Sequence, residues 1–234
     1  MESVKSAKRK DIIFAIVIYL ILFFGSFLIM SLFFDNPNFM IFDITVNSTG
    51  VFIIFDLLIF VAIFCYIKIR KYKLIDFNMT LTNNKKSLLL GVIVSVIIVL
   101  LLLIKFYILE SNTEIPLRST KDYILYFLYI LIFVGIYEEV VFRGFMQNVF
   151  LNGIKSKIIA IILVGIMFAF LHIFSFASST QGTLIELIIL RSSNLLSLFC
   201  LHCLFYLLCK KYNSIIPAII AHLAWDFVLF ILYI

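Results

Sequence analysis

The chain has 234 residues, of which 64% are hydrophobic and only 14% charged, and its mean hydropathy is +1.19. Ordinary soluble domains are close to half apolar and about a quarter charged. This composition excludes a soluble globular domain, a disordered chain and a nucleic-acid-binding module. In lipid, an α-helix bonds its backbone polar groups within one segment. The sequence therefore predicts an all-α, polytopic transmembrane helix bundle.

The first apolar run follows a group of basic residues. Lys5, Lys8, Arg9 and Lys10 precede residues 12–34, a stretch longer than the core of a signal peptide and without a small-residue cleavage site. We therefore expect a first transmembrane helix that is retained.

Seven stretches are long and apolar enough to cross a bilayer, which takes roughly 20 residues. They are residues 12–34, 50–68, 87–109, 123–147, 158–177, 193–209 and 214–234. Residues 183–192 are apolar but interrupted by Glu186 and Arg191. We expect them to lie at the interface or to re-enter, which gives seven spans, or eight if they cross. Short connections predict a single membrane domain over residues 1–234.

The basic residues predict the orientation, because cytoplasmic loops are rich in Lys and Arg. With the N-terminus in the cytoplasm, seven spans place 14 of the 19 basic residues on the cytoplasmic side. The opposite loops hold Asp35, Asp43, Glu110, Glu114 and Asp122. The net charge of +6 is thus mainly a topology signal. A composition rich in Ile, Phe, Lys and Asn favours a multi-pass protein of a bacterial cell membrane.

The cysteines do not predict a disulfide framework. All four lie inside apolar stretches, where single thiols are usually packing residues: Cys65, Cys200, Cys203 and Cys209. His202 lies between two of them, but positions i, i+2 and i+3 do not share one helix face. Packing is therefore favoured over metal binding at this patch.

The polar residues within the predicted spans are the candidates for function. A charged side chain deep in a bilayer costs at least ~2.5–3.5 kcal/mol on insertion scales. These residues are Asp56, Glu138, Glu139, Arg143, His172, His202, His222 and Asp226, and most lie on the last four spans.

Two of these candidates form a predicted pair on the fourth span. Glu139 and Arg143 are four residues apart, so they share a helix face and can pair. Glu138 lies about 100° round the helix and is not neutralised by that contact. A polar packing cluster near the interface is the structural alternative to a functional site.

The histidines carry the next signals. His172 lies on the fifth span, and a lone membrane histidine is more often a hydrogen-bonding residue than a ligand. His222 and Asp226 are four residues apart and face the same way. Such a pair can supply two metal ligands, or an imidazole oriented by a carboxylate, or it can serve packing alone.

Three short motifs occur in order on these apolar segments: Glu-Glu-x-x-x-Arg at 138–143, Phe-x-x-x-His at 168–172 and His-x-x-x-Asp at 222–226. Together they resemble the signature of the CPBP intramembrane proteases. That family includes the CAAX-type prenyl-protein endopeptidases and bacterial proteins tied to bacteriocin processing or self-immunity. The resemblance covers a protease-like core over residues 120–230 and leaves residues 1–119 as N-terminal spans of unassigned role. Many members have Asn in place of Asp226.

The resemblance implies a role for each motif residue. Glu138 would be the general base that activates a water, with His172 assisting, and Glu139 would pair with Arg143 and hold the helix. His222 and Asp226 would bind a metal or stabilise the oxyanion. For a metal, the implied ligands are Glu138, His172 and His222, and zinc is the candidate cofactor. The residues fit a metalloprotease and a metal-free, glutamate-dependent protease equally.

The resulting hypothesis is an intramembrane endopeptidase that cleaves a membrane-associated peptide or lipidated protein near the cytoplasmic face. The alternatives are a non-proteolytic immunity or regulatory membrane protein on the same scaffold, and a small transporter with a proton relay. A CAAX-type role needs prenylated partners, whereas a bacterial chain favours maturation of a peptide pheromone or bacteriocin precursor. Neither the substrate nor the oligomeric state follows from the sequence.

Overall fold

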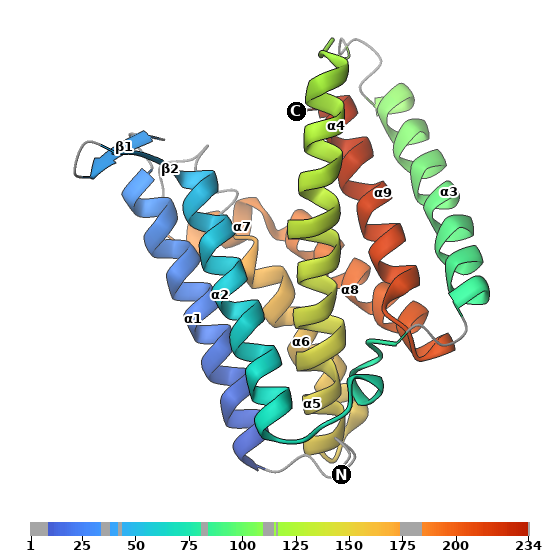
Figure 1. Cartoon of the computed structure of the whole chain (residues 1–234). Coiled ribbons are helices and arrows are strands. Elements are labelled where there is room, and N and C mark those ends of the chain that lie inside the picture. Colours follow the sequence, from blue (N-terminus) through green and yellow to red (C-terminus); the bar gives the residue numbers. More distant parts are fainter. Residues whose placement is uncertain are drawn as a thin grey trace. The chain divides into compact units, whose positions relative to one another are not determined.

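The structure is a computed structural model, and it describes residues 9–33, 38–41, 44–80, 84–109, 115, 117–173 and 184–233. These residues are mostly helical (Figure 1). The α-helices are α1 Arg9–Phe33, α2 Ser48–Ile69, α3 Asn84–Leu109, α4 Thr120–Tyr129, α5 Gln147–Gly153, α6 Lys157–Leu171, α7 Leu184–Leu190, α8 Ser192–Tyr212 and α9 Ile216–Tyr233. Strands β1 Asn38–Ile41 and β2 Ile44–Asn47 pair antiparallel. The predicted all-α helix bundle is confirmed.

Six helical stretches of the described residues are long and apolar enough to span a membrane: Arg9–Phe33, Ser48–Ile69, Lys85–Ile108, Thr120–Gly153, Ser192–Tyr212 and Ile216–Tyr233. The predicted span at 158–177 is the shorter apolar helix α6, which has 15 residues, and residues 174–177 lie outside the described residues. Residues 184–190 form α7, which at seven residues is too short to cross a bilayer alone.

The predicted fourth span is one continuous helical stretch of 34 residues, Thr120–Gly153. Ser119 caps its start, because its side chain accepts from the Asp122 backbone N–H while the Asp122 side chain accepts from the Ser119 backbone. Between α4 and α5 the turns widen into two π-helical segments, η3 (Ile130–Ile136) and η4 (Glu139–Met146). π-Helical turns are rare and often occur at functional sites.

The chain divides into two compact units. Unit 1 comprises Met1–Phe77 and Phe145–Leu204, and unit 2 comprises Asn78–Gly144 and Phe205–Ile234. Two of the divisions between them fall inside helices, because Gly144 lies in η4 and Leu204 lies in α8.

In unit 1, a fully buried carboxylate joins α1 to the end of α2. Asp11 is 0% exposed. Its Oδ1 accepts hydrogen bonds from the Tyr66 hydroxyl at 2.7 Å and from Arg70 Nε at 2.9 Å. Its Oδ2 accepts from the Tyr72 hydroxyl at 3.0 Å and from Arg70 Nη2 at 3.3 Å. A buried charge of this kind is stable only when it is paired and fully hydrogen-bonded.

The way α2 ends brings these donors to Asp11. Lys71 has a left-handed φ of 55°, and the backbone N–H of Tyr72 bonds to the Ile67 carbonyl at 3.1 Å. This six-to-one bond is the Schellman arrangement that turns a chain back at a helix C-terminus. Burial, followed by the hydrogen bond to Asp11, raises the pKa of Tyr72, so its hydroxyl remains a donor at neutral pH.

In unit 2, α3 lies against α9 (Figure 1). Gly91 makes the close approach possible, because an added Cβ would lie 3.0 Å from the Pro217 Cα. One turn further along α3, the Ser95 hydroxyl donates to the Ile220 carbonyl at 3.1 Å. The residue that follows α8, Asn213, has a φ of 51°, and its turn leads the chain into α9.

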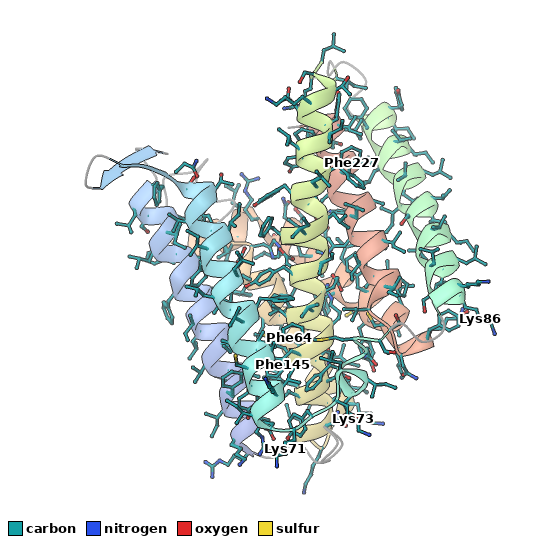
Figure 2. All side chains as sticks on the ribbon, in the orientation of Figure 1. Phe64, Lys71, Lys73, Lys86, Phe145 and Phe227 are labelled. Carbon is teal, nitrogen blue, oxygen red and sulfur yellow. The ribbon has the colours of Figure 1, made fainter. Side chains whose placement is uncertain are left out.

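Lysines gather at the ends of helices rather than along them. Lys71 and Lys73 follow α2 in unit 1, and Lys86 lies in the first turn of α3 in unit 2 (Figure 2). Apolar side chains fill the lengths of these helices and many are exposed, as is typical of a surface that faces lipid. The cytoplasmic N-terminus and the single domain stay predictions.

The Asp11 cluster predicts a stability effect. Asp11→Ala should lower the free energy of unfolding by about 3 kcal/mol, because it leaves the guanidinium of Arg70 without its buried partner. Thermal unfolding in detergent measures the change. Lys10→Ala, at the exposed neighbouring position, is the matched control and should unfold like the wild type. Equal stabilities of the two variants would contradict the role given to Asp11.

Candidate active site

The structure divides the predicted site residues between the two units. Glu138, Glu139, Arg143, His222 and Asp226 all belong to unit 2, and His172 belongs to unit 1. The unit 2 residues come from two places in the sequence, the junction of η3 with η4 and the middle of α9. Unit 2 therefore holds five of the six predicted site residues, and unit 1 holds one.

Glu139 is at the centre of the unit 2 group. Its Oε1 accepts a hydrogen bond from Arg143 Nη1 at 2.9 Å, so the pair predicted from the spacing of four residues is present. The same oxygen lies 2.8 Å from Nδ1 of His222. Glu139 and Arg143 are 0% and 1% exposed, and His222 is 5% exposed. A buried carboxylate thus joins η4 to α9.

This contact determines which ring nitrogen of His222 donates to Glu139. A carboxylate paired with a guanidinium only accepts hydrogen bonds, so Nδ1 carries the proton and donates it to Glu139. The other nitrogen, Nε2, lies 3.2 Å from Oδ2 of Asp226 and 3.9 Å from Oε2 of Glu138. Nε2 is therefore the ring nitrogen that faces the two remaining carboxylates.

Exposure separates the two adjacent glutamates. The side chains of Glu138 and Asp226 are 16% and 26% exposed, whereas those of Glu139 and Arg143 are both 0% exposed. Glu138 and Asp226 thus reach the surface of the described residues in part, whereas the Glu139–Arg143 ion pair is enclosed. The accessible carboxylates therefore suit chemistry, and the buried one suits orientation of His222.

An aromatic ring contacts this buried group on another side. The Phe205 ring centroid lies 5.2 Å from that of His222. The guanidinium carbon of Arg143 lies 5.1 Å from the same Phe205 ring, within cation–π range. Phe205 belongs to α8 and extends the apolar environment in which the Glu139–Arg143 charge pair acts.

Sequence patterns did not reveal the π-helical turns around the two glutamates. Glu139 begins η4, and Tyr137 and Glu138 separate η4 from η3. A separation of four residues indicates a shared face in a regular α-helix of 3.6 residues per turn. No composition or capping signal in residues 130–146 distinguishes the wider turn, so only the structure could show it.

His172 has a different setting in unit 1. It follows the last residue of α6, where the final carbonyls of a helix lack intrahelical partners. The His172 Nδ1–H donates to the Phe168 carbonyl at 2.9 Å. This bond makes Nε2 the nitrogen that carries the lone pair in the neutral ring, as a general base or a metal ligand requires.

The predicted zinc ligands Glu138, His172 and His222 are divided between the two units. No set of three or more His, Cys, Asp or Glu side chains there is arranged to hold a metal ion. Within unit 2, His222 Nε2 and Glu138 Oε2 are 3.9 Å apart, and the third predicted ligand, His172, belongs to unit 1. All four cysteines lie within the described residues, and none of them forms a disulfide.

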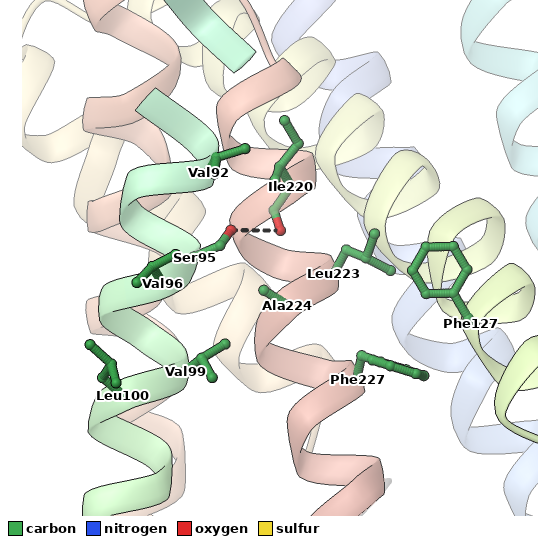
Figure 3. A pocket seen from close by; sticks show the side chains of 10 residues that line it. All are labelled: Val92, Ser95, Val96, Val99, Leu100, Phe127, Ile220, Leu223, Ala224 and Phe227. Atoms are coloured by element: carbon green, nitrogen blue, oxygen red, sulfur yellow. Dashed lines mark hydrogen bonds between the residues drawn. The ribbon is translucent and has the colours of Figure 1, made fainter. Parts of the chain in front are cut away.

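Unit 2 also has an apolar cavity of about 370 Å³, which lies along another face of α9 (Figure 3). Figure 3 shows that Ser95, the one hydroxyl of the lining, bonds to the Ile220 carbonyl. The lining includes none of the predicted site residues. Its lining is Val92, Ser95, Val96, Val99, Leu100, Phe127, Ile220, Leu223, Ala224 and Phe227. We therefore place the candidate chemistry at the Glu138–His222 group.

Comparison with known families agrees with the motifs. The family model described as Type II CAAX prenyl endopeptidase Rce1-like matches residues 120–228. This segment, just under half of the chain, is similar to the Rce1-like endopeptidases. The match contains all six predicted site residues and confirms the resemblance to CPBP intramembrane proteases. No curated protein and no solved structure matches the chain.

The family match and the helices together define the broad class. The six long apolar helices and the Rce1-like segment indicate that the chain is a multi-pass membrane protein. The match supports an intramembrane endopeptidase of the CAAX type in general. The roles of the individual residues stay predictions. The contacts within unit 2 indicate which atom of His222 faces Glu138 and Asp226.

The shared carboxylate predicts a strong dependence of stability on Arg143. Arg143→Met should lower the free energy of unfolding by about 3–5 kcal/mol, because Glu139 then keeps a buried charge without its guanidinium partner. The double variant Glu139→Gln/Arg143→Met removes that charge and should recover much of the loss. Unfolding curves in detergent compare them, and an Arg143→Met protein as stable as the wild type would contradict the pairing.

Proposed function

We propose that the protein is an intramembrane endopeptidase that hydrolyses a peptide bond of a membrane-associated peptide or lipidated protein with a water activated by Glu138. The observation that carries this proposal is the division between the glutamates, with an accessible Glu138 beside a fully buried Glu139 that holds His222. The Rce1-like match over residues 120–228 supports the same class of reaction.

In this proposal Glu138 is the general base. Its carboxylate takes a proton from water as the water attacks the scissile carbonyl, and it then delivers that proton to the leaving amine. The partial exposure of Glu138 leaves room for the water, and the apolar surroundings of the span exclude bulk solvent. Glu139 is unsuited to this role, because its side chain is fully buried and its Oε1 already accepts from Arg143 and His222.

His222 would stabilise the negative charge that develops on the carbonyl oxygen. Its Nδ1–H is fixed by Glu139, so a protonated Nε2 is the donor that can reach an oxyanion. Asp226, 3.2 Å from Nε2, would hold the ring from the other end. Donors fixed in advance in a water-poor site contribute most to catalysis of this kind.

His172 would assist the water. The bond to the Phe168 carbonyl presents its Nε2 as an acceptor, which is the protonation pattern that orientation of a water requires. This role comes from the family resemblance and from the geometry at the end of α6 within unit 1.

Zinc is the alternative source of water activation for the same residues. Glu138, His172 and His222 would hold it, and it would supply Lewis-acid activation of the attacking water. The Glu139 carboxylate on Nδ1 of His222 is the kind of contact that orients a metal-bound imidazole. No step of the proposed reaction is derived through the metal.

The family match and the membrane-spanning helices support a peptide or lipidated protein as the substrate. CAAX-type endopeptidases act on prenylated proteins, and a bacterial relative would instead mature a peptide pheromone or a bacteriocin precursor. We propose a peptide held at the membrane surface in either case. Substrate identity is best sought among short secreted peptides encoded beside this gene.

Replacement of Glu138 tests the reaction. Glu138→Gln should reduce hydrolysis of membrane-anchored peptides in proteoliposomes by roughly 100-fold or more, because the amide cannot accept the proton of the water. Glu186→Gln makes the same chemical change at an exposed position of α7 and should retain activity. Normal cleavage by a folded Glu138→Gln protein would reject the role of Glu138, and normal immunity without any cleavage would favour a non-proteolytic protein.

Metal analysis separates the two versions of the mechanism. The zinc hypothesis predicts about one zinc per purified chain by elemental analysis, and loss of that zinc in His222→Ala. The metal-free version predicts full activity after dialysis against a chelator and no bound zinc. Asp226→Asn should keep the ring orientation in either case, because Glu139 still accepts from Nδ1. Full activity in a zinc-free sample would reject the zinc hypothesis.

A further inference from the structure

Unit 1 contains a buried polar pair that the proposed reaction does not use. Gln147 begins α5 and is 1% exposed, and His202 lies on α8 and is 0% exposed. His202 Nε2–H donates to Gln147 Oε1 at 3.0 Å. An ionisable side chain buried in a membrane helix marks a functional position by default, and its partner indicates the function.

One side chain, Phe168, contacts the rings of both His202 and His172. The Phe168 ring centroid lies 5.9 Å from that of His202 and 4.8 Å from that of His172. The backbone carbonyl of the same Phe168 accepts the Nδ1–H of His172 at 2.9 Å. Phe168 thus contacts both imidazoles, and its carbonyl fixes the tautomer of one of them.

A glycine holds His202 close to α6. A Cβ added at Gly165 would lie 3.1 Å from Cδ2 of His202 and 2.8 Å from the Phe199 ring. Gly165 and Phe168 are three residues apart and share one face of α6, and His172 follows the helix four residues after Phe168. His202 packs against this face, where Phe168 is 1% exposed.

Burial of this pair is not needed for stability alone. Replacement of two bonded polar partners by apolar side chains of similar shape is often nearly neutral, because neither partner is then left unsatisfied. Leu and Phe would fill the same space without a hydrogen bond. A polar pair at this position is therefore better explained by what the imidazole does to its neighbours.

We propose that His202, held by Gln147, is a positioning residue for His172. It fixes the Phe168 ring at the end of α6, and the Phe168 carbonyl then keeps the proton of His172 on Nδ1 and the lone pair on Nε2. The importance of this orientation for catalysis rests on the proposed function, in which His172 assists the attacking water. The orientation itself is a property of unit 1 and is measurable without any substrate.

The number of histidines makes the test direct. The chain has three, His172, His202 and His222, so a full-length protein labelled with ¹⁵N-histidine gives three pairs of ring signals that single replacements assign. The wild type should show His172 as the Nδ1–H tautomer. In Gln147→Leu/His202→Phe, the His172 signals should shift toward a mixture of tautomers, while the thermal midpoint stays close to that of the wild type.

Activity provides the second readout on the same proteins. Loss of an outer partner of a catalytic imidazole typically reduces activity by about 10–100-fold. We expect that fall in kcat for the double variant, with KM within about twofold of the wild type, because substrate contacts are unchanged. Cys200→Ala, at an exposed position on the same helix, is the matched control and should leave both readouts unchanged.

A second variant, Phe168→Leu, tests the positioning of His172 independently. Phe168→Leu keeps the Gln147–His202 bond but removes the ring between the two imidazoles, so the same tautomer shift at His172 is expected. Unchanged His172 signals in either folded variant would overturn the proposal. Failure of the wild type to cleave any peptide would instead reject the proposed function, and the His172 signals would still decide the positioning role.

Discussion

The arrangement of the candidate site depends on one buried carboxylate. Glu139 accepts from Arg143 four residues away and from His222 more than eighty residues away, through the same oxygen. Without Arg143 its burial would be strongly unfavourable, and without His222 η4 would lose its polar contact with α9. This contact decides that Nδ1 of His222 is occupied and that Nε2 faces Glu138 and Asp226.

In the proposed reaction the paired glutamates have separate tasks. The buried Glu139 orients His222, whereas the partly exposed Glu138 would activate the water. Adjacent residues on a helix point about 100° apart, so one can face the interior and the other the accessible side. In unit 1, a backbone carbonyl orients the second imidazole. The Phe168 carbonyl at the end of α6 accepts from Nδ1 of His172, so Nε2 of that ring points away from this carbonyl.

Much of the architecture was predictable, because hydropathy and spacing are local signals. Apolar runs of sufficient length predicted the six long helices, and a separation of four residues predicted the Glu139–Arg143 and His222–Asp226 contacts. Contacts between distant segments were not predictable. In the sequence Arg70 is only one more basic residue near a span, although it holds Asp11 in the structure. Gln147, which contacts His202, is an uncharged amide, and such a residue in a span has no pattern of its own. The π-helical turns also leave no trace in composition.

The origin of the oxygen in the product tests the central claim most directly. A membrane-anchored peptide is cleaved by excess protein in ¹⁸O-labelled water, within a single turnover, and the new C-terminus is analysed by mass spectrometry. Activation of water by Glu138 predicts one ¹⁸O atom in the new carboxylate, and no product from Glu138→Gln. A new carboxylate that carries only ¹⁶O, or equal product from Glu138→Gln, would contradict the account.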